Sequence, residues 1–144
     1  MILKLKRLKE TAVLPERKTE GSAGYDLCAC IAGEFTIEPG ELVMLPTGLA
    51  AEIPQGCAGM IFTRSGLGVK HGVAVSNGVG VIDSDYRGEI HVGLRNSSRV
   101  PYTIQPGERI AQLIVMPVCL PEIQEVRELS ETQRGTGGFG STGQ

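Results

Sequence analysis

The sequence of 144 residues contains no tryptophan, three phenylalanines, three tyrosines and two histidines. It also lacks any apolar run close to the roughly 20 residues that a membrane-spanning helix needs. The amino-terminal stretch MILKLKRLKE is basic, but no apolar segment of the signal-peptide type follows it. These absences argue against a membrane-embedded or secreted protein. We expect a cytoplasmic protein with no membrane partner.

The chain also lacks an excess of positive charge, since 14 Lys and Arg stand against 16 Asp and Glu, for a formal net charge of −2. A nucleic-acid-binding surface normally shows a basic stripe. The one basic cluster consists of Lys4, Lys6, Arg7 and Lys9, which alternate with apolar residues. This alternation predicts an edge strand whose lysines face water, so we expect no nucleic-acid partner.

Metal-ligand patterns are missing too. The four cysteines are Cys28, Cys30, Cys57 and Cys119. They form no CxxC pair and have no histidine-rich neighbourhood, whereas a zinc site needs closely spaced ligands. We therefore expect small buried thiols in a reducing compartment. His71 has no partner at ligand spacing, and His91 is predicted to be an exposed strand residue.

What the sequence does contain is a regular series of short apolar runs separated by turns. The turn signals are EPGE at 38–41, IPQG at 53–56, SNG at 76–78, DYRG at 85–88 and QPGE at 105–108. In EIHVGLRN, Ile90, Val92 and Leu94 alternate with polar residues, which is the pattern of a half-buried strand. Short strands at this spacing predict one all-β domain, a sandwich or a barrel.

Three segments add detail to this β prediction. The stretch RSGLGVKHG (64–72) predicts one short helix. Asn77-Gly78 in VAVSNGVGVI is a strong hairpin signal. In EIQEVREL, the three-residue spacing of Ile123, Val126 and Leu129 on its own predicts a second helix.

Three polar residues interrupt apolar strands. Asp83 has the strand parity of Val79 and Val81, so a continued strand points its carboxylate toward the apolar side. Gln112 lies in ERIAQLIVMPV and Asp26 in AGYDLCA, both otherwise apolar. A buried carboxylate must be paired, solvated in a cleft or used in function. Each residue alone is compatible with a structural hydrogen bond, but three together indicate a functional site.

Arg64, Ser65 and Gly66 offer a guanidinium, a hydroxyl and an unhindered backbone N–H at the start of the predicted helix. This combination suits phosphate. The stretch is not a Walker A motif, which requires GxxxxGK[ST].

The last stretch, RGTGGFGSTGQ (134–144), is rich in Gly, Ser and Thr and is predicted to be flexible. A passive tail does not explain its aromatic Phe139 or the charge of Arg134 at its root.

Together these stretches resemble the trimeric deoxyuridine triphosphatase (dUTPase) family. The segments that carry the resemblance are AGYDLCA (23–29), RSGLGVKHG (64–72), NGVGVIDSDYRGEI (77–90), PGERIAQLI (106–114) and RGTGGFGSTG (134–143). The resemblance implies a compact jelly-roll-like β-barrel over residues 1–133 and a flexible Gly-rich C-terminal lid over 134–144. It also implies a homotrimer whose sites gather residues from more than one subunit. In this family fold, residues 123–129 are extended rather than helical.

The reaction implied by the resemblance is hydrolysis of dUTP to dUMP and pyrophosphate with Mg²⁺, which lowers dUTP and supplies the precursor of dTMP. Asp83 matches the family aspartate that activates the attacking water. Asp26 and Gln112 match residues that hold the metal through its bound waters.

The remaining predicted site residues bind the substrate. Asn77 and the backbone of Gly80, Val81 and Ile82 would recognise uracil, and Tyr86 would lie against the deoxyribose. Phosphate-binding residues would be Arg64, Ser65, Gly66 and Gln112. From the lid, Phe139 would stack on uracil, while Arg134, Gly140 and Ser141 would bind the phosphates.

Two alternatives remain at this point. The dCTP deaminase family shares the fold, but its catalytic glutamate would align near Gly93, which cannot transfer a proton. A non-catalytic trimer that binds nucleotides or proteins is the other possibility, against which the intact Asp83, Gln112 and tail argue.

Overall fold

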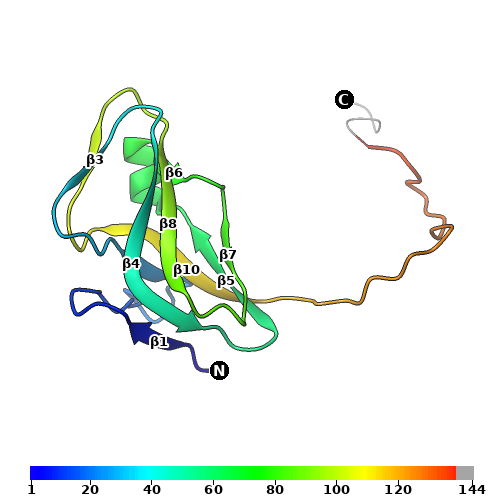
Figure 1. Ribbon diagram of the computed structural model, residues 1–144. Helices are drawn as coiled ribbons and strands as arrows, with labels where there is room; N and C mark the ends of the chain where they lie inside the picture. The colour runs from blue at the N-terminus through cyan, green and yellow to red at the C-terminus, as the bar shows by residue number, and fades with distance from the viewer. Residues whose placement is uncertain (139–144) are drawn as a thin grey trace.

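The computed structural model describes residues 1–138, and this part of the chain is nearly all β (Figure 1). Its strands are β1 (Lys4–Arg7), β2 (Tyr25–Cys28), β3 (Phe35–Ile37), β4 (Leu42–Glu52), β5 (Cys57–Phe62), β6 (Val73–Val75), β7 (Gly80–Ile82), β8 (Glu89–Asn96), β9 (Tyr102–Ile104) and β10 (Arg109–Pro117). The short helix expected after the RSG stretch is present as one π-helical segment, η1 (Gly66–Lys70). Within the described residues, no helix is long and apolar enough to cross a membrane.

The strands form three antiparallel sheets. One has the order β1-β4-β8-β6, the second β2-β10-β5-β7, and the third pairs β3 with β9. The all-β prediction is therefore confirmed. Over residues 1–138 the sheets remain open at their edges and do not close into a barrel.

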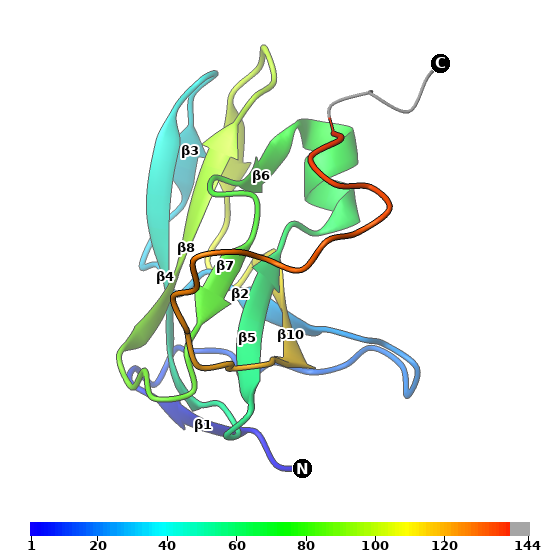
Figure 2. The same ribbon diagram turned by 90° about the vertical axis from the view of Figure 1, so that its right-hand side faces the viewer.

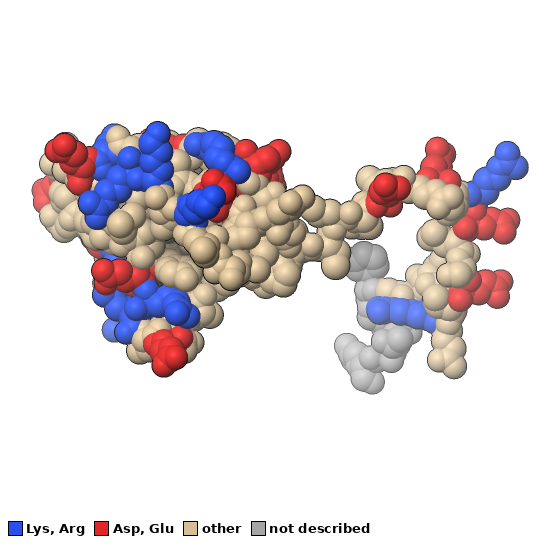
Figure 3. All heavy atoms as spheres, turned by 90° about the horizontal axis from the view of Figure 1, so that it is seen from below, with Lys and Arg blue, Asp and Glu red and all other residues tan. Residues whose placement is uncertain are grey.

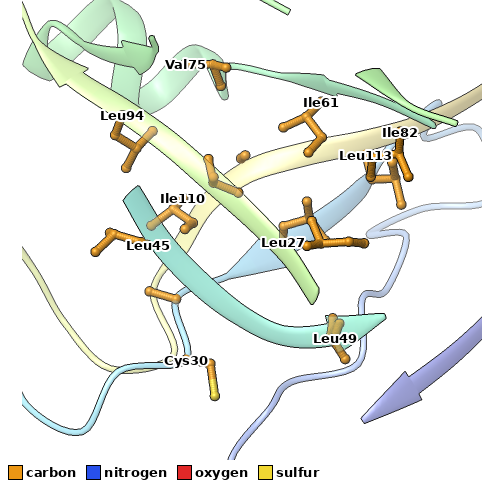
Figure 4. Close-up of a cluster of buried hydrophobic side chains, with 14 of the residues drawn as sticks. Leu27, Cys30, Leu45, Leu49, Ile61, Val75, Ile82, Leu94, Ile110 and Leu113 are labelled. Carbon is orange, nitrogen blue, oxygen red and sulfur yellow. The ribbon is translucent and has the colours of Figure 1, made fainter. Parts of the chain in front are cut away.

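The hydrophobic core lies between the two four-stranded sheets, whose inward side chains meet in Figure 4. Leu45, Leu49 and Leu94 enter it from one sheet, and Leu27 and Leu113 from the other. Alternation in β8 is as predicted, since Ile90, Val92 and Leu94 are all at most 2% exposed. Burial of this apolar surface fixes the spacing of the two sheets on which the site is built.

Strand β1 is an edge strand, as its alternating lysines predict, because it pairs with β4 alone. Lys4 donates to Glu52 at 2.7 Å on the exposed side. The buried-thiol prediction is correct for Cys28, Cys30 and Cys57 and wrong for Cys119, which is exposed. Cys119 lies beyond the end of β10, where no second sheet covers it.

The hairpin predicted at Asn77-Gly78 is wrong, although its turn is present. Gly78 has a φ of +77°, and its N–H donates to the Val75 carbonyl at 3.1 Å. However, β6 pairs with β8, and β7 pairs with β5. The turn therefore connects two sheets. Alternating apolar residues predict strands on both sides of a turn, but they do not say which strands become neighbours.

The helix that the spacing of Ile123, Val126 and Leu129 predicts on its own is absent, since residues 118–138 contain no helix or strand. Ile123 is 100% exposed and Leu129 87% exposed. Figures 1 and 3 show this segment leading away from the sheets after β10. With no surface to pack against, an apolar stripe does not stabilise a helix.

A bulge in β4, between Pro46 and Ala50, ties the site to the core. Gly48 within it has a φ of +68°. Its N–H donates to Glu89 Oε1 at 2.8 Å, and its carbonyl accepts from the Leu8 N–H at 2.8 Å. The bulge thereby holds the start of β8, directly after the 83–88 loop (Figure 2).

We expect Gly48→Ala to lower the free energy of unfolding by about 3 kcal/mol, measured by denaturant titration. The left-handed conformation disfavours a side chain by ~1–2 kcal/mol, and overpacking adds ~1–3 kcal/mol. A Cβ at this position would lie 2.7 Å from Cys30 Sγ and 2.8 Å from Ala12 Cβ. The control is Gly56→Ala, with φ +77° but no atom within 4 Å, which should cost only about 1 kcal/mol. Equal losses would contradict the steric explanation.

Candidate active site

A hollow of about 340 Å³ forms beside β7 and the start of β8. It brings together six of the residues predicted for catalysis and for base and sugar recognition, which are Asn77, Gly80, Val81, Ile82, Asp83 and Tyr86. Met44, Glu89 and His91 also line it and were not predicted as site residues. We call this hollow the Asp83 hollow.

The Asp83 side chain is exposed rather than buried. It keeps the strand parity of Val79 and Val81, but that parity is the outer face, where the two valines are 39% and 61% exposed. The predicted apolar surroundings are therefore wrong for the single chain. The carboxylate is solvated at the rim of the hollow, where it can accept a proton from water.

The loop after Asp83 is held by hydrogen bonds to backbone carbonyls. The Tyr86 N–H donates to the Asp83 carbonyl at 3.2 Å. Arg87 Nη1 donates to the Ser84 carbonyl at 2.7 Å and the Tyr86 carbonyl at 2.9 Å. Tyr86 Oη donates to the Glu89 carbonyl at 3.0 Å, so the ring folds back toward β8.

A second hollow, of about 330 Å³, contains four of the predicted phosphate and metal residues. These are Asp26, Arg64, Ser65 and Gln112. Glu16, Lys18, Ser22 and Arg109 line it as well and were not predicted. We call it the Arg64 hollow. It lies at the β2 edge of the sheet β2-β10-β5-β7. The strand at the opposite edge, β7, leads directly to Asp83.

Asp26 is paired, which explains how a carboxylate is accommodated in an apolar strand. Its side chain is 17% exposed, with Oδ1 accepting from Arg64 Nε at 2.8 Å and Oδ2 from Arg109 Nη1 at 3.1 Å. Arg64 Nη1 also donates to the Arg109 carbonyl at 3.2 Å. The carboxylate fixes two guanidinium groups at one hollow, an arrangement suited to a polyphosphate.

Gln112 stands directly opposite Asp26 on β2 and Phe62 on β5. It is half-buried, and its Nε2 donates to the Thr63 carbonyl at 3.1 Å. This bond leaves Oε1 to accept, and the missing side chain of Gly24 leaves room beside it. A register shift between Arg109 and Ala111 turns Ile110 into the core, while Gln112 stays only half-buried.

Helix η1 is held in place by Leu67 and by His71 just after its end, while the residues at its start are exposed to solvent. Ser65 and Gly66 are exposed, and Leu67 is buried at 4%. At the other end, the His71 ring packs on Tyr102 with a centroid distance of 4.7 Å. Burial, together with the 2.6 Å hydrogen bond to Glu108, raises the pKa of Tyr102 to about 12, so this hydroxyl remains a donor.

Cys28 neighbours Asp26 but is not a nucleophile. Burial, and secondarily the charge of Asp26, raises the pKa of its thiol, which keeps it protonated at neutral pH.

Of the unpredicted residues in the Arg64 hollow, Arg109 could have been found from the sequence. It lies in the PGERIAQLI stretch, and a charge at the start of a buried strand was an available signal. Lys18 lies in an irregular segment whose sequence offers no such signal.

The two hollows share no residue and are well separated in one chain. Gln112 is opposite Phe62, whereas Ile82 is opposite Gly59, three residues along β5. Two strand spacings across and three residues along place the Ile82 and Gln112 backbones about 14 Å apart. Asp83 is farther still, so one phosphate group cannot contact Asp83 and Gln112 of the same chain.

Of the predicted lid residues, Arg134 lies within the described chain, and Phe139, Gly140 and Ser141 lie outside the described residues. Arg134 is exposed, and its Nε donates to the Gly137 carbonyl at 2.9 Å. It belongs to the segment that leads away from the sheets and lines neither hollow.

The donor set fits Mg²⁺ held through water rather than directly. Among residues 1–138, no group of three or more His, Cys, Asp or Glu is arranged to hold a metal. Mg²⁺ retains several of its waters and needs few protein ligands. A carboxylate has about four acceptor positions, and the two guanidiniums occupy two of those of Asp26. The others, and Oε1 of Gln112, can accept from metal-bound waters.

The position aligned with the deaminase glutamate is filled by a neighbour. A Cβ at Gly93 would lie 2.6 Å from Ser76 Oγ, and the Gly93 carbonyl accepts from the Ser76 N–H at 2.9 Å. A side chain here would have to displace the Ser76 hydroxyl, and glycine itself offers no group for proton transfer, which argues against deamination.

Comparison with known proteins places this chain among the dUTPases. The family model described as dUTPase matches residues 10–143. The deoxyuridine 5'-triphosphate nucleotidohydrolase of Desulfitobacterium hafniense (strain DSM 10664 / DCB-2) is 53% identical over 131 residues, covering 90% of this chain and 87% of the relative. That of Desulfotalea psychrophila is 51% identical over 137 residues, covering 95% and 91%.

Solved structures agree with these relatives. A Staphylococcus bacteriophage 80alpha dUTPase mutant with dUpNHpp has a TM-score of 0.90 at 30% identity and covers 99% of this chain and 98% of its own. A dUTPase mutant from phage phi11 of S. aureus, described with a structural Mg(II) ion, has a TM-score of 0.80 at 27% identity. It covers 89% of this chain and 98% of its own.

Proposed function

This chain belongs to the dUTPase family and is a nucleotide hydrolase, and we propose that it hydrolyses dUTP to dUMP and pyrophosphate with Mg²⁺ as a homotrimer. The observation that carries the proposal is the collection of predicted residues in two hollows, one with the carboxylate of Asp83 and one with the guanidinium of Arg64. The reaction lowers dUTP and supplies the precursor of dTMP. A cytoplasmic location is part of the proposal.

Asp83 is the proposed general base. Its exposed carboxylate takes a proton from a water, which then attacks the α-phosphorus in line and displaces pyrophosphate. Phosphoryl transfer depends on positioning and charge neutralisation more than on covalent steps. Arg64, Ser65 and Gly66 hold the phosphates, and the exposed backbone of Gly66 allows close approach.

Mg²⁺, when bound, neutralises the charge of the triphosphate. Asp26 and Gln112 would hold it through its waters, and the ion pairs of Asp26 with two arginines keep that carboxylate in one orientation. The structural Mg(II) ion named for the phi11 dUTPase supports a role for this metal in the family.

Selectivity for uracil and deoxyribose is assigned to the Asp83 hollow. The backbone of Gly80, Val81 and Ile82, with the amide of Asn77, offers hydrogen-bonding groups to uracil, and the narrow site opposes the thymine methyl. The ring of Tyr86 lies against the sugar and leaves no space for a 2′-hydroxyl.

The homotrimer is supported by the separation of the two hollows and by the outer face of β2-β10-β5-β7. On that face Met60 stands opposite both Val81 and Ile114. Val81 is 61% exposed and Met116 41% exposed. An antiparallel sheet normally presents polar residues to water on its outer face, so an apolar face next to Gln112 is suited to a second subunit. Each site then combines an Asp83 hollow and an Arg64 hollow from different subunits.

The test is pyrophosphate release with Mg²⁺ from dUTP, UTP, dTTP and dCTP in parallel. Release from dUTP alone is the expected result. Binding of dUTP without release from any substrate would instead favour a nucleotide-binding trimer without catalysis.

Residues 134–144 are proposed to close over the site as a lid on the domain formed by 1–133, with Phe139 stacked on uracil. Arg134, Gly140 and Ser141 would bind phosphates. Base–aromatic stacking contributes ~1–3 kcal/mol, enough to order a Gly-rich segment when substrate is present. Closure would exclude water other than the nucleophile.

Deleting residues 134–144 should therefore lower kcat/KM for dUTP by about tenfold to a hundredfold, the equivalent of the lost stack. The melting temperature should stay unchanged, since the described part of this segment, residues 134–138, belongs to neither sheet. The control is deletion of 142–144 alone, which removes none of the predicted ligands. Full activity after the longer deletion would overturn the lid.

A further inference from the structure

We propose that Gly88 is a positioning residue for sugar selection. The space left by its missing side chain lets the Tyr86 ring fold against the backbone, where it can exclude a ribose 2′-hydroxyl. This inference rests on the proposed function, which assigns the Tyr86 ring to the deoxyribose.

The contact between the two residues is close. A Cβ built on Gly88 would meet Tyr86 Oη, with Cζ at 2.6 Å and Cε2 at 2.9 Å. Real Cβ atoms do not approach other atoms this closely, so the hydroxyl end of the ring occupies the place of a side chain at position 88. The hydrogen bond from Tyr86 Oη to the Glu89 carbonyl, at 3.0 Å, depends on the same placement.

The backbone does not itself require glycine at this position. Gly88 is absent from the glycines with positive φ, which in the described chain include Gly40, Gly78 and Gly107. Alanine would therefore suit the backbone of residue 88, and the ring is the group it would strike. Glycine serves here to leave space.

Of the two groups in collision, the ring is the one that can move. The start of β8 is fixed, because Glu89 pairs with Ala50 and accepts a hydrogen bond from the Gly48 N–H at 2.8 Å. Tyr86 is 46% exposed and can rotate into solvent. A side chain at position 88 would thus push the ring off Glu89 while the strand stays in place.

Moving this ring changes the wall of the Asp83 hollow, since Tyr86 and Asp83 both line it. A packed ring gives that wall a fixed position. A displaced ring leaves space where the 2′-position of the sugar lies, so kcat/KM for UTP should rise relative to kcat/KM for dUTP. Asp83 and the residues of the Arg64 hollow are unchanged.

The experiment compares kcat/KM for dUTP and UTP in the wild type, Gly88→Ala, Tyr86→Ala and the double variant. Gly88→Ala should lower the dUTP/UTP ratio by roughly tenfold or more, the scale at which single steric contacts discriminate substrates. Tyr86→Ala should lower it similarly, and the double variant should lose no more than either, because both changes remove one contact. Gly33→Ala is the control, since that glycine has no positive φ and no atom of the described residues lies within 4 Å of an added Cβ. It should keep the wild-type ratio.

A wild-type ratio in Gly88→Ala, or additive losses in the double variant, would overturn the inference while leaving the proposed function intact. A wild type that does not prefer dUTP would instead overturn the proposed function. If Gly88→Ala does not fold, the double variant decides. Recovered folding with the low ratio of Tyr86→Ala supports the collision, and failure to recover overturns it.

Discussion

Replacing Asp83 by asparagine should lower kcat for dUTP by about 10²–10⁴-fold, the contribution typical of a general base. Asparagine has nearly the same shape as aspartate but cannot take a proton from water. The side chain is exposed at the rim of its hollow and forms no ion pair with a cation among residues 1–138, so the substitution should leave the fold unchanged. Affinity for a non-hydrolysable dUTP analogue should change little, because the base acts on water.

The measurement is pyrophosphate release at saturating dUTP, together with calorimetric binding of the analogue. Asp85→Asn is the matched control, since Asp85 is exposed in the same loop but does not line the hollow. It removes the same charge from nearly the same place. A similar loss in both variants would point to a general effect of charge, and unchanged turnover in Asp83→Asn would exclude Asp83 as the base.

Strands in which apolar and polar residues alternate could be predicted from the sequence, because the alternation indicates which side chains are buried. In β8 the alternation of Ile90 and Val92 with polar residues reflects which side chains face the core, and that alternation survives in the structure. The edge position of β1 follows from its lysines, which water must solvate. These predictions depend only on each segment and its solvent.

Pairing between segments was not predictable in the same way. The Asn77-Gly78 turn forms, yet β6 and β7 join different sheets, because their partners lie elsewhere in the chain. The pairing of Asp26 with Arg109 spans 83 positions. A sequence shows that a carboxylate in an apolar strand needs a partner, but it does not show which of several arginines provides one.

The environment predicted for Asp83 is wrong, although the residue does line the hollow. Strand parity indicated an apolar environment, and the structure places the carboxylate on an outer face that is open in the single chain. The apolar neighbours Val79 and Val81 are real but exposed. Under the proposed trimer they would be covered by another subunit, a contact that no pattern within one chain encodes.

Mixing two inactive variants should restore activity if each site takes its hollows from different subunits. Asp83→Asn disables one hollow and Arg64→Ala the other, and either homotrimer should be nearly inactive. In randomly mixed trimers, a site is intact when its Asp83 hollow comes from an Arg64→Ala subunit and its Arg64 hollow from an Asp83→Asn subunit. Each condition is met half of the time, so about a quarter of the wild-type activity should return. The measurement is dUTP turnover after co-refolding equal amounts of the two variants.

The matched control pairs two defects of the same hollow. A mixture of Asp83→Asn and Asp83→Ala leaves every site without the carboxylate of Asp83 and should recover nothing. Recovery only for defects in different hollows is what the proposed trimer predicts, since each of its sites combines hollows from two subunits. If the mixture of Asp83→Asn and Arg64→Ala stays inactive although mixed trimers form, each site lies within one subunit. The Asp83 and Arg64 hollows of one chain would then have to approach each other by a rearrangement of the sheet that carries them both.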